Sequence, residues 1–157
     1  MKNKDTILIV ITVILLAVLV IGFVYDNNTS LLERTNNIAI KDDENLEIVK
    51  VKKIGFMYTR AAYEAKVQIK NGDADAYIIN IALTYGGTGQ MLDYEQYKEF
   101  EANTLDSVTI KPNPKQDSFV WIFGAPLDEK SDKKIFYVVC HEDADNKAFI
   151  YMYYSRK

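Results

Sequence analysis

The stretch KIFYVVCHEDADNKAFIYMYYS, residues 134 to 155, contains two runs of Val, Ile, Phe and Tyr separated by a short acidic segment. Each run has the length of a β-strand, and β-branched and aromatic side chains favour strands because they pack well on a pleated surface. The segment between them, Glu142 to Asn146, is rich in turn-forming residues. We therefore predict an antiparallel pair of strands, Lys134 to His141 and Lys147 to Ser155.

The same pattern of short apolar runs bounded by Gly, Asp, Asn and Pro continues toward the N-terminus. It predicts five more strands: Leu46 to Ile54, Ala62 to Lys70, Ala76 to Tyr85, Ser107 to Lys111 and Ser118 to Phe123. Asn71-Gly72-Asp73 predicts a type I′ hairpin turn between the second and third of the seven strands, because Asn-Gly readily takes the positive φ angles of that turn.

A single helix is expected in the outward part of the chain. The segment MLDYEQYKEFEAN, residues 91 to 103, follows a glycine-rich loop at Gly86 to Gly89 and has aromatic residues spaced along one broad stripe. Seven strands and one helix predict a mainly β fold, an antiparallel β-sandwich of immunoglobulin-like type with one inserted helix. An α+β layer is the alternative.

The N-terminal part is different, since residues 7 to 25 read ILIVITVILLAVLVIGFVY without a charged residue. As a helix this run would span about 28 Å, close to the thickness of the hydrocarbon layer. It predicts a single transmembrane signal anchor. A cleaved signal peptide is the alternative, but the run is longer than a usual cleavable core and no Ala-x-Ala-like site follows it.

The charges around this run predict the topology. Lys2 and Lys4 precede it and Asp26 follows it, so residues 1 to 6 should be cytoplasmic by the positive-inside rule. Residues 26 to 45 are polar and read as a stalk, and 46 to 157 would form an extracytoplasmic β domain. The expected location is the cell membrane, with the chain held there through residues 7 to 25.

Composition argues against several functions. The chain has 19 basic and 22 acidic residues, and its basic groups are short and mixed with acids, which argues against nucleic acid as a partner. It has one cysteine, Cys140, beside its one histidine, His141. Neighbouring residues of a strand point to opposite faces, so these two should not form a nucleophile pair. We expect Cys140 to be buried on the face of Phe136 and Val138.

Other candidate chemistry is equally weak. The glycine-rich loop lacks the Lys and Ser/Thr of a phosphate-binding loop, and Glu95 and Glu99 lie one turn apart on a face expected to be solvated. Acidic residues in two turns could offer oxygen ligands to calcium, but their spacing does not match an EF-hand. These residues are Asp73, Asp75, Glu142, Asp143 and Asp145. We predict no metal, no cofactor and no enzymatic activity.

Aromatic residues are the remaining candidates for a binding surface, because Tyr and Trp combine an apolar face with a polar tip. The chain has 11 tyrosines and one tryptophan. Trp121, Tyr151 and Tyr153 are the candidate ligand-binding residues, although a central strand buried on both faces would show the same pattern.

These observations favour a single-pass, membrane-anchored binding or assembly module without catalytic activity, whose partner is another envelope protein. One alternative is a module that binds glycan or cell wall through Trp121 and the C-terminal tyrosines. A second is a surface hydrolase, which would need converging carboxylates or a bulge that brings Cys140 and His141 together.

Overall fold

The backbone and most side chains of the chain are defined in a computed structural model. It describes residues 2–25, 27, 28, 32, 44–55, 62–70, 74–84, 89–124, 133–142 and 147–156. Side chains are described throughout these ranges except at residues 2, 3, 5, 23–25, 133, 134 and 156.

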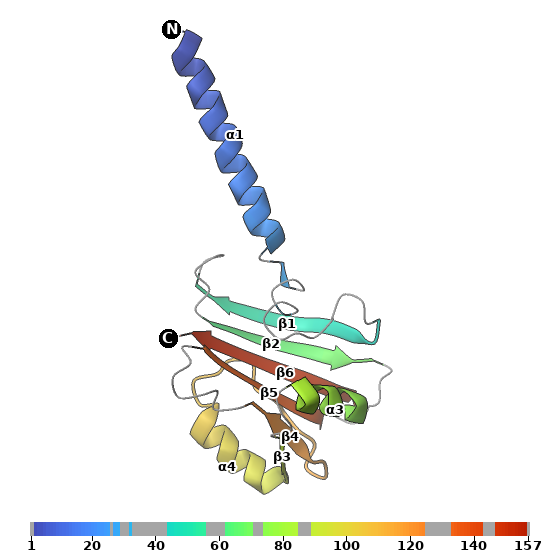
Figure 1. Cartoon of the computed structure of the whole chain (residues 1–157). Helices are drawn as coiled ribbons and strands as arrows, with labels where there is room; N and C mark the ends of the chain where they lie inside the picture. Colours follow the sequence, from blue (N-terminus) through green and yellow to red (C-terminus); the bar gives the residue numbers. More distant parts are fainter. Residues whose placement is uncertain are drawn as a thin grey trace.

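An N-terminal helix precedes a sheet that carries two further helices (Figure 1). The helices are α1 (Lys2–Tyr25), α3 (Ala74–Thr84) and α4 (Tyr94–Thr104). The strands are β1 (Leu46–Ile54), β2 (Ala62–Ile69), β3 (Gly89–Leu92), β4 (Val120–Phe123), β5 (Lys133–Glu142) and β6 (Lys147–Arg156).

All described strands belong to one six-stranded sheet with the order β1-β2-β6-β5-β4-β3, and every neighbouring pair is antiparallel. β5 and β6 form the predicted hairpin, closed by the pair Glu142 and Lys147, whereas residues 143–146 lie outside the described part. The β-sandwich is not confirmed, because one sheet covered by helices takes the place of two facing sheets. The fold is a mixed α/β arrangement of one antiparallel sheet and helices, which is nearer to the α+β layer named as the alternative.

The strand predicted at Ala76 to Tyr85 is wrong, since this segment belongs to helix α3. Its buried residues, Ala74 and Ile81, and the half-buried Ile78 recur at helical spacing and face the sheet. Ile79 and Leu83 point outward and are exposed. A segment that is apolar on nearly every side fits both a strand and a helix, so periodicity cannot separate them.

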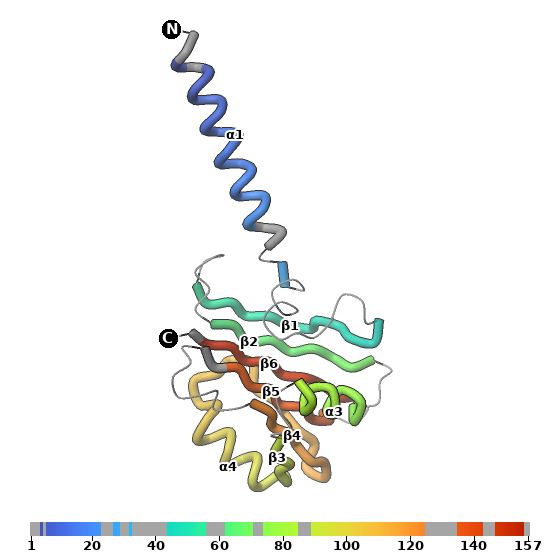
Figure 2. Tube along the Cα trace, viewed as in Figure 1, coloured from blue at the N-terminus to red at the C-terminus, as the bar shows by residue number. Residues whose placement is uncertain are grey.

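The hairpin predicted around Asn71-Gly72-Asp73 is also wrong, although these three residues lie outside the described part. β2 is followed by a helix, and its partners in the sheet are β1 and β6. The chain therefore leaves the sheet after β2 and returns to it at the far edge as β3, a path that can be followed in Figure 2.

The predicted helix is confirmed with a shifted start. Asp93 caps α4: its Oδ1 accepts a hydrogen bond from the Gln96 N–H at 2.9 Å, and the Asp93 N–H donates to Gln96 Oε1 at 3.0 Å. Met91 and Leu92 belong instead to β3, the short edge strand that the sequence did not reveal. Residues 86–88 of the glycine-rich loop lie outside the described part.

Both faces of the sheet are covered. The α3 face packs beneath α3, and the α4 face packs beneath α4 and the segment that follows it. The α3 face is defined by Ala65, Val67, Tyr137, Val139, Ile150 and Met152. The α4 face is defined by Val138, Cys140, Phe149, Tyr151 and Tyr153.

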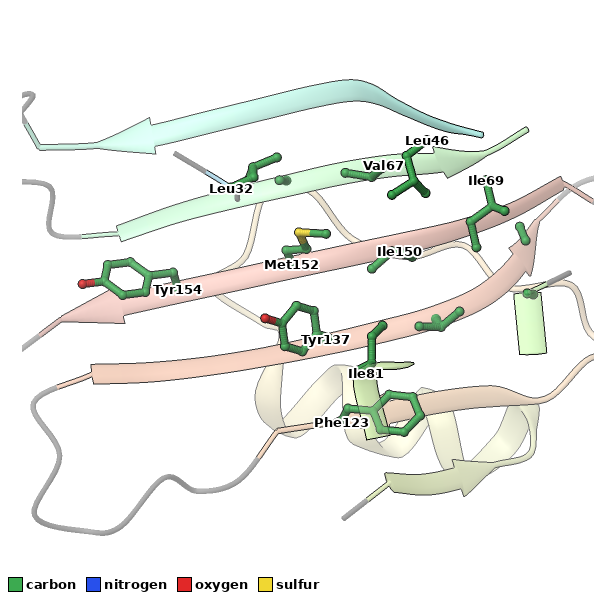
Figure 3. Close-up of a cluster of buried hydrophobic side chains, with 14 of the residues drawn as sticks. Leu32, Leu46, Val67, Ile69, Ile81, Phe123, Tyr137, Ile150, Met152 and Tyr154 are labelled. Atoms are coloured by element: carbon green, nitrogen blue, oxygen red, sulfur yellow. The ribbon is translucent and has the colours of Figure 1, made fainter. Parts of the chain in front are cut away.

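The core of the α3 face reaches outside the predicted β domain. Leu32, which the sequence places in the polar stalk, is 0% exposed and belongs to the same buried cluster as Val67 and Met152. Figure 3 shows Leu32 over the β2 and β6 part of this face and Ile81 over the part near β4 and β5. The segment after α1 therefore contributes to the fold of the sheet domain.

Helix α1 consists of 24 residues and extends away from the sheet in Figure 1. Its large apolar side chains from Ile7 to Ile21 are between 48% and 66% exposed. Among the residues described here, no helix meets the length and hydropathy that a membrane crossing requires.

We expect the substitution Leu32→Ala to lower the free energy of unfolding of the sheet domain by about 2 to 4 kcal/mol, because it leaves a cavity in a closed core. Urea unfolding followed by tryptophan fluorescence would measure this change. Asn28→Ala, at an exposed neighbouring position, is the control and should change the stability by less than about 0.5 kcal/mol. Equal effects of the two substitutions would show that Leu32 is not part of the core.

Candidate functional site

A cavity of about 260 Å³ lies between the N-terminal turn of α3 and the adjoining parts of β4 and β5. It is the clearest candidate site in the described part of the chain, because it joins aromatic and polar side chains from three elements. Those used in the argument below are Asp75, Ile78, Ser118, Phe119, Trp121 and His141.

The aromatic side of the cavity is built by one strand and the residues that precede it. Phe119 and Trp121 line the cavity, and the Trp121 ring stacks on Phe123 with a centroid distance of 6.0 Å and an interplanar angle of 10°. Phe123 is buried, Trp121 is half-buried and Phe119 is 56% exposed. Phe119, Trp121 and Phe123 alternate along the segment FVWIF, so their rings lie on one face. They form a row that runs from the buried core to the exposed edge of the cavity.

The polar side of the cavity comes from α3 and β5. Asp75 lies in the first turn of α3, where the helix dipole stabilises a carboxylate. His141 follows Val139 on the α3 face, and Ser118 lies near the start of β4. This combination of an aromatic platform with a carboxylate, an imidazole and a hydroxyl group can hold a small polar ligand that has one apolar face.

Only one of the three predicted ligand-binding residues reaches this cavity. Trp121 lines it, whereas Tyr151 and Tyr153 lie on the opposite face of the sheet and are 0% and 4% exposed. The structure therefore does not bring the three together. Burial and the hydrogen bond donated to Glu142 raise the pKa of Tyr151 well above its ordinary value, so its hydroxyl group stays protonated.

Cys140 and His141 are separated as the strand geometry predicts. The Cys140 side chain is buried in the cluster of the α4 face with Val138, and Phe136 packs against this cluster. Burial raises the pKa of the Cys140 thiol, which keeps the sulfur protonated and unreactive. His141 contributes to the cavity on the other face.

Two glutamates are buried on the α4 face, and both hold the segment that follows α4. This segment, residues 108–115, is called the strap below. Glu64 is 7% exposed, and its Oε2 accepts hydrogen bonds from the N–H groups of Thr109 and Ile110 at 2.8 and 2.7 Å. The Tyr153 hydroxyl group donates to the Ile110 carbonyl at 2.8 Å. Side chains of the sheet therefore replace the strand partner that the strap lacks.

The second buried glutamate, Glu142, anchors the other end of the strap. Its Oε1 accepts from the Asn113 N–H at 2.7 Å and from the Tyr151 hydroxyl group, and its Oε2 lies 2.5 Å from Lys66 Nζ. Lys66 Nζ is also 3.9 Å from the centroid of the Phe149 ring. All these groups are engaged with one another or with backbone, which is the arrangement of a structural network.

The strap explains why the strand predicted at Ser107 to Lys111 is wrong. Pro112 and Pro114 have no N–H group, so this part of the chain cannot form a regular ladder with a neighbouring strand. The Tyr97 hydroxyl group donates to the Pro112 carbonyl at 3.1 Å, and the Lys115 N–H donates to the His141 carbonyl at 2.9 Å. Apolar residues do alternate along this segment, but the backbone N–H and C=O groups of the strap bind mainly to side chains and not to a neighbouring strand.

The acidic residues considered for calcium are not brought together where the structure describes them. Asp75 lies on the α3 face and Glu142 on the α4 face, whereas Asp73, Asp143 and Asp145 lie outside the described residues. Within the described ranges, no three side chains of the metal-binding types converge.

Sequence reasoning missed the partners of Trp121. The alternation of Phe119 and Trp121 on one face was visible in FVWIF, but Asp75 joins them only because α3 is a helix that crosses this face. Comparison of the chain with protein-family models, curated proteins and solved structures finds no significant match.

We expect Glu64→Ala to destabilise the domain by about 3 kcal/mol, because two backbone N–H groups in the strap lose their acceptor, one of them at the buried Ile110. Glu64→Gln keeps an acceptor oxygen and should cost less. Glu47→Ala, which removes an exposed partner of Lys70, is the matched control and should cost at most about 1 kcal/mol. Urea unfolding would compare the three, and equal losses for Glu64→Ala and Glu47→Ala would contradict the structural role.

Proposed function

We propose that the chain is a single-pass, membrane-anchored binding or assembly module without catalytic activity. Residues 7 to 25, the apolar part of α1, are the signal anchor, and residues 1 to 6 are cytoplasmic. The sheet domain lies outside the cytoplasm, where its partner is another protein of the cell envelope. The orientation is supported by Lys2 and Lys4 before the apolar run and Asp26 after it.

The observation that carries this proposal is the exposure of α1. Its large apolar side chains from Ile7 to Ile21 are exposed around the whole helix, and the only polar side chain among residues 7–21 is that of Thr12. Thr12 Oγ1 donates to the Leu8 carbonyl at 2.9 Å, so its hydroxyl group is satisfied within the helix. A helix that is apolar on all sides needs an apolar surrounding.

The length of α1 fits the same surrounding. The apolar run from residue 7 to residue 25 corresponds to about 28 Å of helix, which is close to the roughly 30 Å of a hydrocarbon layer. The side chains of α1 are described without interruption from Thr6 to Gly22, and the apolar run proposed as the anchor extends beyond them to residue 25.

The proposed lack of catalytic activity is supported by the contacts of the buried ionisable side chains. Glu64 and Glu142 bind backbone N–H groups of the strap, and the Cys140 thiol is closed in on the face opposite to His141. A surface hydrolase, the second alternative, would need carboxyl groups that converge across an open cleft. The two buried carboxylates instead serve the fold.

We expect the full chain to remain in the membrane fraction after alkaline carbonate extraction. Replacing Leu15 and Leu16 by Asp should move most of it to the soluble fraction, because each Asp near the centre of a span costs about 3 kcal/mol. Leu83→Asp, an equally drastic change at an exposed position of α3, is the control and should leave the chain in the membrane. Recovery of the unmodified chain in the soluble fraction would refute the anchor.

Binding of glycan or cell wall is a second candidate function, and the cavity beside Trp121 favours it. Sugar rings stack their apolar face on aromatic side chains while their hydroxyl groups hydrogen-bond to polar neighbours, and Trp121, Asp75 and His141 line one cavity. The candidate now rests on Trp121 and Phe119, because Tyr151 and Tyr153 are buried on the other face.

Trp121 is the only tryptophan, so its fluorescence reports directly on this cavity. If the second candidate is correct, titration with soluble cell-wall glycan fragments should give a saturable change in emission, and Asp75→Asn should weaken the apparent affinity at least about ten-fold by removing a charged hydrogen-bond acceptor. Glu95→Gln, at an exposed position of α4, is the control. An unchanged spectrum at millimolar glycan would eliminate this function.

A further inference from the structure

The tether between α1 and the folded core is short. α1 ends at Tyr25, and Leu32 is already buried in the core of the sheet domain. Seven peptide steps separate these residues, which span at most about 25 Å when fully extended. A folded domain of this size has a diameter of roughly 34 Å, estimated from its expected radius of gyration of about 13 Å. The tether is therefore shorter than the domain is wide.

A tether of this length restricts which side of the domain can face the membrane. Leu32 lies over the β2 and β6 part of the α3 face (Figure 3), and β1 is the edge strand beside β2. In Figure 1 the end of α1 also lies on the β1 side of the sheet, with α4 on the far side. If α1 is inserted as proposed, β1 is the strand nearest the lipid headgroups.

The residues of β1 suit a negatively charged surface. Its sequence, LEIVKVKKI, contains three lysines and one glutamate in a chain with a net charge of −3. Glu47 is paired with Lys70 at 3.0 Å, and Lys52 lies 3.6 Å from Glu64. Lys50 is exposed, and the ion pairs of Glu47 and Glu64 given above are made with other lysines. Counted over Leu46–Ile54 alone, the strand carries two more lysines than glutamates, and the exposed Glu44 lies two residues before it.

β1 also presents apolar side chains beside these lysines. The register between β1 and β2 shifts between Ile48 and Lys50, which leaves Val49 in a bulge, 51% exposed. Ile54 at the end of the strand is 43% exposed. Lysines interspersed with exposed aliphatic side chains are typical of surfaces that lie in the headgroup region of a bilayer.

We propose that the β1 edge of the sheet rests on the anionic headgroups of the same membrane that holds α1. This inference rests on the proposed insertion of α1. Lys50 contributes charge attraction, Val49 and Ile54 contribute apolar contact, and the tether through Leu32 keeps the strand within reach. The contact fixes the orientation of the domain, so that α4 and the strap face away from the bilayer.

The test uses the full chain in lipid nanodiscs with a fluorophore at one introduced cysteine. Val49→Cys places the label on β1, and Ala102→Cys places it at an exposed position of α4. The native Cys140 is buried with a raised pKa and should not react with the reagent. A quencher attached to lipid headgroups then reports how close each label lies to the membrane.

We expect headgroup quenching at position 49 to be several-fold stronger than at position 102, and stronger in discs containing phosphatidylglycerol than in phosphatidylcholine alone. Lys50→Glu should reduce the ratio of docked to undocked domain at least about five-fold, because one lysine near an anionic surface contributes about 1 kcal/mol. Lys111→Glu, at an exposed position of the strap, is the charge-matched control and should change nothing.

Equal quenching at the two positions would overturn the proposal. Equal quenching in the two kinds of disc would also overturn it, because no electrostatic contact with the headgroups would then exist. Energy transfer between labels on two chains would overturn it as well, because it would show that β1 pairs with a second copy. Failure of the chain to co-elute with the discs would refute the membrane anchor itself. Co-elution without preferential quenching at position 49 would refute only the orientation.

Discussion

Strands β5 and β6 at the centre of the sheet carry large apolar side chains on both faces, and this constraint shapes the rest of the structure. Tyr151 and Tyr153 face α4, whereas Ile150 and Met152 face the side of α3, and all four are buried. Such strands are stable only if both faces of the sheet are covered. The chain meets this demand with separate covers, which come from different parts of the sequence.

Neither cover is a helix alone. On the α3 face, α3 lies over one part and Leu32, from the segment that follows α1, lies over another (Figure 3). On the α4 face, α4 is continued by the strap, whose backbone groups are bound by Glu64, Glu142 and Tyr153. The buried charges therefore close the fold. Among the described residues, the cavity beside Trp121 and the lysine-bearing strand β1 are the surfaces proposed above for interaction.

The sequence predicted the elements that have a one-sided or clearly bounded pattern. The strand at Leu46 to Ile54 and the β5–β6 hairpin are confirmed, because turn residues and alternation agree there. The helix predicted over residues 91 to 103 is confirmed with a later start, at Tyr94. It failed at α3, whose apolar residues suit either a strand or a helix, and at the strap, where prolines and distant glutamates replace a strand partner. The cavity could not be predicted for the same reason, since it requires Asp75 and Trp121 to meet across the α3 face.

The burial of Leu32 links the helix proposed to cross the membrane with the core of the sheet domain. The most direct measurement is methyl NMR spectroscopy of the full chain in nanodiscs. We predict nuclear Overhauser effects between the Leu32 methyl groups and methyl groups of the α3-face cluster, such as those of Val67 and Met152. Random-coil chemical shifts for Leu32 without such contacts would contradict this prediction, because the domain would then hang on a free stalk.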